Sequence, residues 1–281
     1  MYSLVVANEK GERLQLTQNP NYSITAITGL NPPNSNINTA VNANFDGSVY
    51  KSSRMNNRNI VITLMVEEPV EINRIALYNF FKSKKSCTVF YKNKSRDVSI
   101  LGYVESMPIN YFDKKEKVQI SVICPKPYFE DIDTQNIEFS SEYALFQFPF
   151  VIQDTIEFSE LILNEQVIVT NSGDVATGVI IQFYARGHVE NPKIYNITTG
   201  DKMLINITLE EGDIITIDTT KGSKRITLNS DGVITNILNN LDKTSTWLTL
   251  DTGDNYLMYS ADEYPQFLFC SVIYSELYEG V

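Results

Sequence analysis

The apolar residues of this chain alternate with a period of two over most of its length. In the stretch NIVITLMV, residues 59–66, Ile60, Ile62, Leu64 and Val66 lie on one face of an extended strand. Strands that bury one face against a core show this alternation. It recurs at residues 117–124, 178–187, 202–209, 213–219, 224–234 and 247–260. The sequence therefore predicts a mainly β protein, with tight hairpin turns at residues 229–232 and 252–255.

One segment breaks the alternation and predicts a helix. Between Glu67 and Lys85 the apolar residues recur mostly at intervals of three or four, the spacing of a helical stripe. Pro69 suits the first turn. Acidic residues come first and lysines last, which complements the helix dipole. We expect the helix to cover one side of an N-terminal sheet. Its stripe consists of Ile72, Ile75, Leu77, Tyr78 and Phe81.

The charge of the chain changes near its middle, where two prolines also end a predicted strand. Its 281 residues are enough for two domains. Pro125 and Pro127 end the strand before them, because proline cannot donate to a β ladder. Residues 1–135 carry 16 basic and 13 acidic side chains, whereas residues 136–281 carry 7 and 21. We therefore predict an N-terminal β domain with one helix over residues 1–135 and a second, all-β domain over residues 136–281.

Side chains suited to catalysis are scarce. The single histidine, His188, lies in a predicted turn, so no Ser-His-Asp or Cys-His arrangement can be built. Cys87, Cys124 and Cys270 are far apart in the sequence, which indicates buried, reduced thiols and not a zinc site. The acidic turns lack a full calcium-binding loop. We expect no enzyme activity, no metal and no other cofactor.

Charge and hydropathy also argue against two classes of partner. The acidic half repels nucleic acid, and the first half is not basic enough to wrap it. No run reaches the ~18 apolar residues of a membrane span. The first residues lack the basic region and apolar run of a signal peptide, so we expect synthesis in the cytoplasm of the producing cell.

The stretch FDGSVYKSSRMNNRNIVITLMV, residues 45–66, places a glycine-bearing turn and a basic loop before an apolar strand. Asp46 stands in the turn, and Lys51, Arg54 and Arg58 follow in the loop. Two interpretations stay open. These residues lie at a subunit interface, where the cations pair with acidic groups of a neighbouring copy and fix its register. Alternatively, the loop is only solvated.

Several motifs, taken in order, resemble the distal tail proteins of long-tailed phages that infect Gram-positive bacteria. In the first half they are residues 45–66, the helix after them, and the Cys-Pro-x-Pro corner CPKPYFED at residues 124–131. In the second half they are NSGDVATGVIIQFYARG, NPKIYNITTGDKMLINITLEEGDIITIDTTKGSKRITL and WLTLDTGDNYLMY. Residues 138–160 have no counterpart in the resemblance.

The resemblance implies a structural hub at the tip of the virion tail. In that family a ring, commonly a hexamer, joins the tail tube to the adsorption apparatus. The N-terminal domain is β-barrel-like with one helix and forms the ring, and the C-terminal domain is a galectin-like β-sandwich. The expected partners are further copies of the chain, the tail tube protein, and tail-tip or receptor-binding baseplate proteins. A tail-tube or baseplate subunit of a contractile particle is a related possibility.

A carbohydrate-binding or carbohydrate-cleaving tail-tip protein is the alternative. The 16 tyrosines offer rings that stack on sugars. However, the segment HVENPK, residues 188–193, is one residue out of step with the sugar-binding signature HxNPR of galectins, so we do not expect the galectin sugar site.

Overall fold

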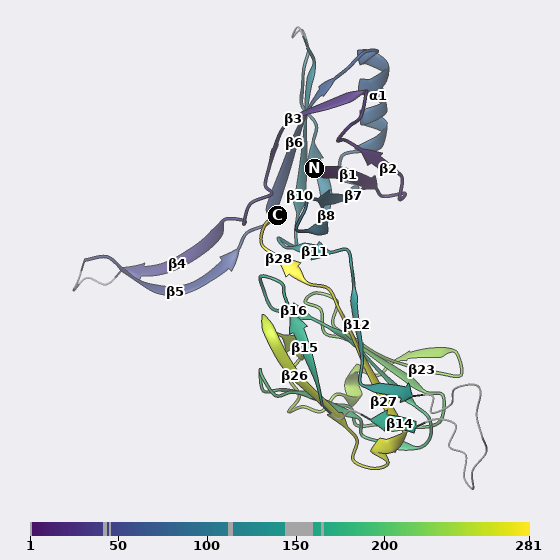
Figure 1. Ribbon diagram of the computed structural model, residues 1–281. Helices are drawn as coiled ribbons and strands as arrows, with labels where there is room; N and C mark the ends of the chain where they lie inside the picture. The colour runs from purple at the N-terminus through teal and green to yellow at the C-terminus, as the bar shows by residue number, and fades with distance from the viewer. Residues whose placement is uncertain (1, 42–43, 45, 112–114, 144–159, 164–165) are drawn as a thin grey trace. The chain divides into compact units, whose positions relative to one another are not determined.

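The chain folds into two compact units in the computed structural model, which describes residues 2–41, 44, 46–111, 115–143, 160–163 and 166–281 (Figure 1). Unit 1 contains Met1–Asp133 together with Leu277–Val281, and unit 2 contains Thr134–Glu276. The last five residues, expected with the second domain, thus return to unit 1, and the chain passes between the units twice. All strand pairs among the described residues are antiparallel, and α1 is the one α-helix among them.

Unit 1 is built on one large sheet. Its main path runs β2-β1-β7-β8-β10-β6-β3, with β9 on β10, β11 on β8 and β28 on β11. The ends of this path, β2 and β3, do not pair with each other in the described residues, so the sheet is open. Its strands are β1 (Ser3–Asn8), β2 (Arg13–Gln15), β3 (Tyr22–Thr28), β6 (Arg58–Val66), β7 (Ser86–Lys92), β8 (Asp97–Ser106), β9 (Ile109–Asn110), β10 (Lys117–Cys124), β11 (Phe129–Asp131) and β28 (Leu277–Tyr278).

The alternating residues form the core of unit 1, as their period predicts. In β6 all four residues of the predicted inner face are buried. The alternating residues of β10 are buried as well, namely Val118, Ile120 and Val122. One polar residue on the opposite face of β10 is also buried. The hydroxyl of Ser121 lies 2.8 Å from Oε2 of Glu105 and 3.0 Å from Oδ1 of Asn59, so its single proton has an acceptor away from water.

The helix α1 (Val70–Phe80) is shorter than predicted, and its buried face is different. Leu77 and Phe81 are buried, but Ile72 and Ile75 of the predicted stripe are exposed. Asn73 takes the inward position one turn before Leu77. Its amide donates to the carbonyl of Glu67 at 2.9 Å. The predicted lysines follow the helix end and do not lie in its last turn.

Unit 2 has two principal sheets around one core. The six-stranded sheet has the order β12-β27-β17-β22-β23-β24, and the four-stranded sheet has the order β15-β26-β19-β20. Their strands are β12 (Gln135–Glu138), β15 (Gln166–Asn171), β17 (Ile180–Ala185), β19 (Lys193–Asn196), β20 (Asp201–Leu204), β22 (Ile214–Asp218), β23 (Arg225–Ser230), β24 (Val233–Asn236), β26 (Gly253–Ser260) and β27 (Leu268–Tyr274). Smaller pairs join β13 (Ser140–Tyr143) with β14 (Glu160–Leu163), β16 (Thr177–Gly178) with β25 (Thr249–Leu250), and β18 (Val189–Glu190) with β21 (Thr208–Leu209).

The core of unit 2 also follows the alternation, although two local expectations fail. Apolar residues from both principal sheets pack together in one buried cluster. The turn at Asp231 and Gly232 is the predicted tight hairpin, between β23 and β24. The turn near Gly253 is not a hairpin, because β25 and β26 pair with different strands. Residues 202–209, expected as one strand, divide between β20 and β21.

Candidate functional site

The basic stretch forms part of a two-stranded arm. The predicted loop is strand β5 (Ser48–Met55), which pairs with β4 (Ser35–Val41) and with no other strand of the described residues. Figure 1 shows this hairpin, called the arm below, projecting from the sheet of unit 1. It is inserted between β3 and β6, which are neighbours in that sheet. The backbone N–H of Asn56 donates to the carbonyl of Asn34 at 3.1 Å and closes the base of the arm.

The arm exposes apolar side chains on both strands. Val41 is 85% exposed, Tyr50 60%, Ile37 59% and Val49 44%. An isolated two-stranded hairpin is marginally stable in water, and its open edges invite pairing with another chain. The arm therefore has the character of a segment that is covered in an assembly. Sequence reasoning did not identify these apolar residues, because they lie among serine, asparagine and threonine in two short stretches.

Three of the four predicted interface residues lie on the arm and are exposed. Asn38 pairs with Ser52 and Thr39 with Tyr50, so Lys51 is the extra residue of a β-bulge. Such bulges re-aim side chains. Arg54 lies nearer the base, opposite Asn36, and Asp46 lies at the turn.

The structure corrects the expectation for Arg58. This residue begins β6 and is only 2% exposed, so it lies inside unit 1 and is not available to a neighbouring copy. Its guanidinium donates to four backbone carbonyls, those of Gly29 (2.5 Å), Asn31 (2.7 Å), Pro127 (2.7 Å) and Glu279 (2.5 Å). It also stacks on the ring of Phe129, 4.4 Å from the centroid. Burial lowers the pKa of Arg58, but arginine remains protonated in proteins.

Arg58 connects the base of the arm to the last residues of the chain. Two of its carbonyl partners belong to the segment that leads from β3 into β4, and a third lies in the last five residues. The backbone N–H of Val281 donates to the carbonyl of Leu30 at 3.1 Å, next to the same segment. The base of the arm is thus fixed, whereas both strands beyond it are exposed.

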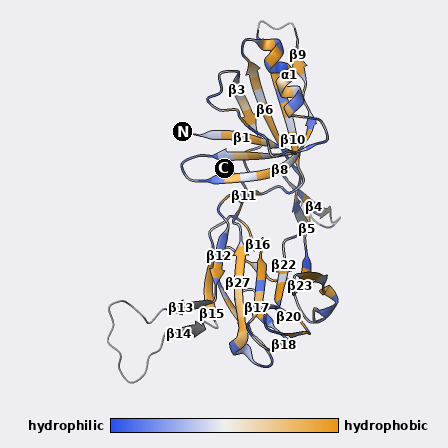
Figure 2. Cartoon of the chain, turned by 90° about the vertical axis from the view of Figure 1, so that its right-hand side faces the viewer, coloured by the Kyte–Doolittle hydropathy of each residue, from blue (hydrophilic) through white to orange (hydrophobic). Residues whose placement is uncertain are grey.

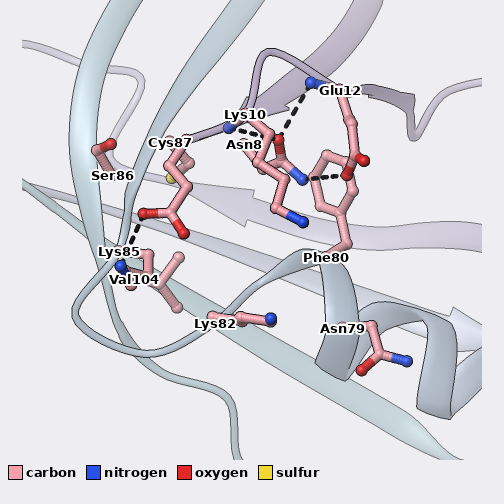
Figure 3. Close-up of a pocket in the computed structure, with 11 residues that line it drawn as sticks. Asn8, Lys10, Glu12, Asn79, Phe80, Lys82, Lys85, Ser86, Cys87 and Val104 are labelled. Atoms are coloured by element: carbon pink, nitrogen blue, oxygen red, sulfur yellow. Dashed lines mark hydrogen bonds and ion pairs between the residues drawn. The ribbon is translucent and has the colours of Figure 1, made fainter.

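The described residues show no catalytic arrangement. A shallow pocket lies between the β1–β2 turn and the end of α1 (Figure 3). Its acidic side chains are engaged, since Glu9 pairs with Lys85 at 3.0 Å and Asn8 donates to Glu12 at 2.7 Å. No group of three possible metal ligands occurs in the described part of the chain. In that same part, no helix has the length and hydropathy needed to cross a membrane.

The three cysteines are free and buried, as the sequence indicates. Burial raises the pKa of Cys87 to about 12 and that of Cys124 to about 11, so neither is a reactive thiolate near neutral pH. His188 is exposed and lies between Glu210, at 2.9 Å, and Glu190, at 3.4 Å. It contacts no nucleophile that an imidazole would activate.

A comparison with protein families finds a match over part of the chain. Residues 172–278 match the family model described as siphovirus-type tail component, C-terminal domain. No curated protein matches the chain.

Solved structures with the same fold span nearly the whole chain. The crystal structure of SPP1 Dit, described as a paradigm of the hub adsorption apparatus in phages infecting Gram-positive bacteria, aligns with a TM-score of 0.69 and 11% identity over 98% of each chain. A chain of the phage P2 baseplate, in its activated conformation with Ca, aligns with a TM-score of 0.54 and 10% identity over 100% of each chain. The same baseplate with Sr gives 0.53 and 10% over the same coverage.

Proposed function

We propose that this chain is a member of the siphovirus-type tail component family and a distal tail protein that forms the structural hub of a phage tail tip. In this role it works by self-association and by docking other tail proteins. It has no catalytic step to perform. The family match over residues 172–278 supports the tail assignment, and the fold shared with SPP1 Dit over 98% of the chain supports the hub.

The arm is the observation that carries self-association. Four apolar residues and two cations are exposed on a ribbon that pairs with nothing else among the described residues. Covering this ribbon buries apolar surface, which stabilises a contact by ~25 cal/mol per Å². In the proposed hub, the arm of each subunit lies on the next subunit. Such a head-to-tail contact closes into a ring when the rotation allows it, and we propose six copies.

The cations give this contact its register. Lys51 and Arg54 are exposed and have no ion-pair partner among the described residues, so acidic groups of the neighbouring copy are their proposed partners. Opposite charges across an interface speed association and select orientation. Asp46, at the turn of the arm, is proposed to lie in the same contact.

The two units take separate roles in this proposal. Unit 1 forms the ring, because the arm belongs to it, and we propose that its open sheet curves into a barrel-like form. Unit 2 is a galectin-like sandwich directed toward the adsorption apparatus, and its two sheets around one core support that architecture. The tail tube protein and the tail-tip or receptor-binding proteins of the baseplate are the proposed further partners.

Native mass spectrometry of the purified chain tests the proposal. We expect a ring of six copies at high protein concentration. A variant in which residues 36–54 are replaced by a two-residue turn should stay folded, because β3 and β6 still pair, but should have the mass of one copy. The outcome that contradicts the proposal is a wild-type chain with the mass of one copy at all concentrations and low salt.

A further inference from the structure

The side of α1 that faces away from the sheet is apolar in its middle. Ile72 is 67% exposed and Ile75 is 47% exposed, one helical turn apart. A helix that only meets water on this side normally carries charged or polar residues there. Figure 2 shows hydrophobic residues along α1, beside β6. The exposed residues of the helix, called the outer stripe below, are Glu71, Ile72, Ile75, Ala76 and Asn79.

Charges of opposite sign lie at the two ends of the outer stripe. Glu71 stands at its start, and Lys82 follows the end of the helix, and both are exposed. Figure 3 shows Asn79 on α1 and Lys82 on the loop that follows. Arg74, the one cation within the helix, lies 2.9 Å from Glu116 and is therefore engaged away from Glu71. Along its length the outer stripe thus presents an acid, two isoleucines and a base.

The arm presents the same three features. Asp46 lies at its turn, and Lys51 lies further along β5, and both are exposed. Between these two charges stands Tyr50, and the strand register puts its ring on the same face of the arm as Ile37 and Val41. The arm and the outer stripe therefore match in charge and in apolar character when they run in opposite directions.

The spacing of the charges also matches. Lys51 is five positions from Asp46, which is ~17 Å in an extended strand that rises ~3.3 Å per residue. Lys82 is eleven positions from Glu71, which is ~16 Å at the helical rise of 1.5 Å per residue. Both pairs of opposite charges can therefore form at once, with the apolar side chains between them.

The arm lies away from the helix of its own copy. The arm joins β6 at Arg58, whereas α1 follows Val66 at the other end of this strand. Because the nine residues of β6 rise ~3.3 Å each, its two ends are ~26 Å apart. Figure 1 shows the arm projecting away from α1. The arm that fits the outer stripe is therefore that of a second copy.

We propose that the arm of one copy lies antiparallel along the outer stripe of α1 in the next copy. Lys51 pairs with Glu71 at the start of the helix, and Asp46 pairs with Lys82 after its end. Tyr50 packs between them against the exposed isoleucines. The arm and the stripe are different surfaces of one unit, so the contact is head-to-tail and closes into a ring when the rotation allows it. This inference rests on the proposed hub and adds the surface that receives the arm.

An exchange of charges, followed by sedimentation velocity of the full chain, tests this contact. Lys51→Glu and Glu71→Lys should each raise the protein concentration needed for assembly by about tenfold or more, because like charges then meet at every contact. The two changes together restore opposite charges and should assemble within about threefold of the wild-type concentration. The matched control joins Lys51→Glu with Glu130→Lys, since Glu130 is exposed on β11, and it should assemble no better than Lys51→Glu alone. Circular dichroism confirms that each variant is folded.

Disulfide cross-linking locates the contact directly. A chain with both Tyr50→Cys and Ile75→Cys should form, on oxidation, a ladder of linked copies on a non-reducing gel, because two sulfurs join only when their Cα atoms lie within ~7 Å. Either substitution alone should give no ladder. The three native cysteines are buried and do not compete.

Three results overturn this contact. One is that Glu71→Lys assembles as the wild type does, since α1 then does not receive the arm although the hub stands. Another is that the exchanged pair assembles no better than Lys51→Glu. The third is an assembled chain with both cysteines that forms no ladder. A wild-type chain with the mass of one copy at all concentrations contradicts the hub itself, and this inference fails with it.

Discussion

Replacing Arg58 with methionine should destabilise unit 1 far more than any substitution on the arm. The change keeps an apolar stem beside Phe129 but removes the donors to four carbonyls. A hydrogen bond to a charged group contributes ~1.5–3 kcal/mol, and such terms do not add fully. Leaving a buried acceptor without its donor costs ~1–3 kcal/mol, and because several carbonyls lose their donor we expect a loss of unfolding free energy of about 3–5 kcal/mol.

Differential scanning calorimetry of the full chain measures this effect. A loss of 1 kcal/mol lowers Tm by ~2–4 °C in a chain of this size class, so the transition of unit 1 should fall by about 10 °C. Arg54→Met is the matched control and should stay within about 0.5 kcal/mol of the wild type, because Arg54 is exposed. If the two variants melt alike, Arg58 does not hold the root of the arm and the reasoning is refuted.

Two further substitutions test local claims. Gly29→Ala should destabilise unit 1 much more than Gly11→Ala does. Both glycines have positive φ, but only a Cβ at Gly29 would meet a backbone atom, the carbonyl oxygen of Asn59 at 2.1 Å. Equal losses of stability in urea unfolding would argue against close packing at the base of the arm. His188 has its pKa raised above 6.5, first by Glu210 and then by Glu190. The contacts of protonated His188 with these carboxylates therefore stabilise the fold fully below pH ~6.5, and this stabilisation disappears as pH rises through the raised folded-state pKa. His188→Gln should thus lower Tm at pH 5.5 but not at pH 9, and an equal shift at both would contradict the ion pairs.

The core was predictable because buried strand residues follow a local pattern in the sequence, the alternation of apolar and polar side chains. Alternation in residues 59–66 and 117–124 identified strands and their inner faces, since each strand has one face toward the core. The helical stripe was a weaker guide. Asn73 is buried because its side-chain amide donates to the carbonyl of Glu67. The apolar spacing had instead predicted buried positions for Ile72 and Ile75.

The sequence singled out the basic stretch as a candidate interface, but it did not predict the structure of that stretch. The basic stretch was identified, yet β5 lacks the one-sided alternation that marks a strand against a core, since nearly all of its residues are exposed. The role of Arg58 depends on Glu279, 221 positions away, and no local pattern reports such a contact. The return of the chain end to unit 1 was missed for the same reason.

Sedimentation velocity of a charge-reversed arm tests the central claim most directly. In Lys51→Glu/Arg54→Glu, like charges face each other wherever the arm meets acidic groups, and a ring repeats the cost at every contact. Losing one side of a buried charged pair costs ~2–5 kcal/mol. The control Lys94→Glu/Lys126→Glu makes the same change of charge at exposed positions outside the arm. The account predicts single copies for the arm variant, with an unchanged circular dichroism spectrum, and a ring for the wild type and the control. A ring that survives the reversal at ordinary salt would contradict it.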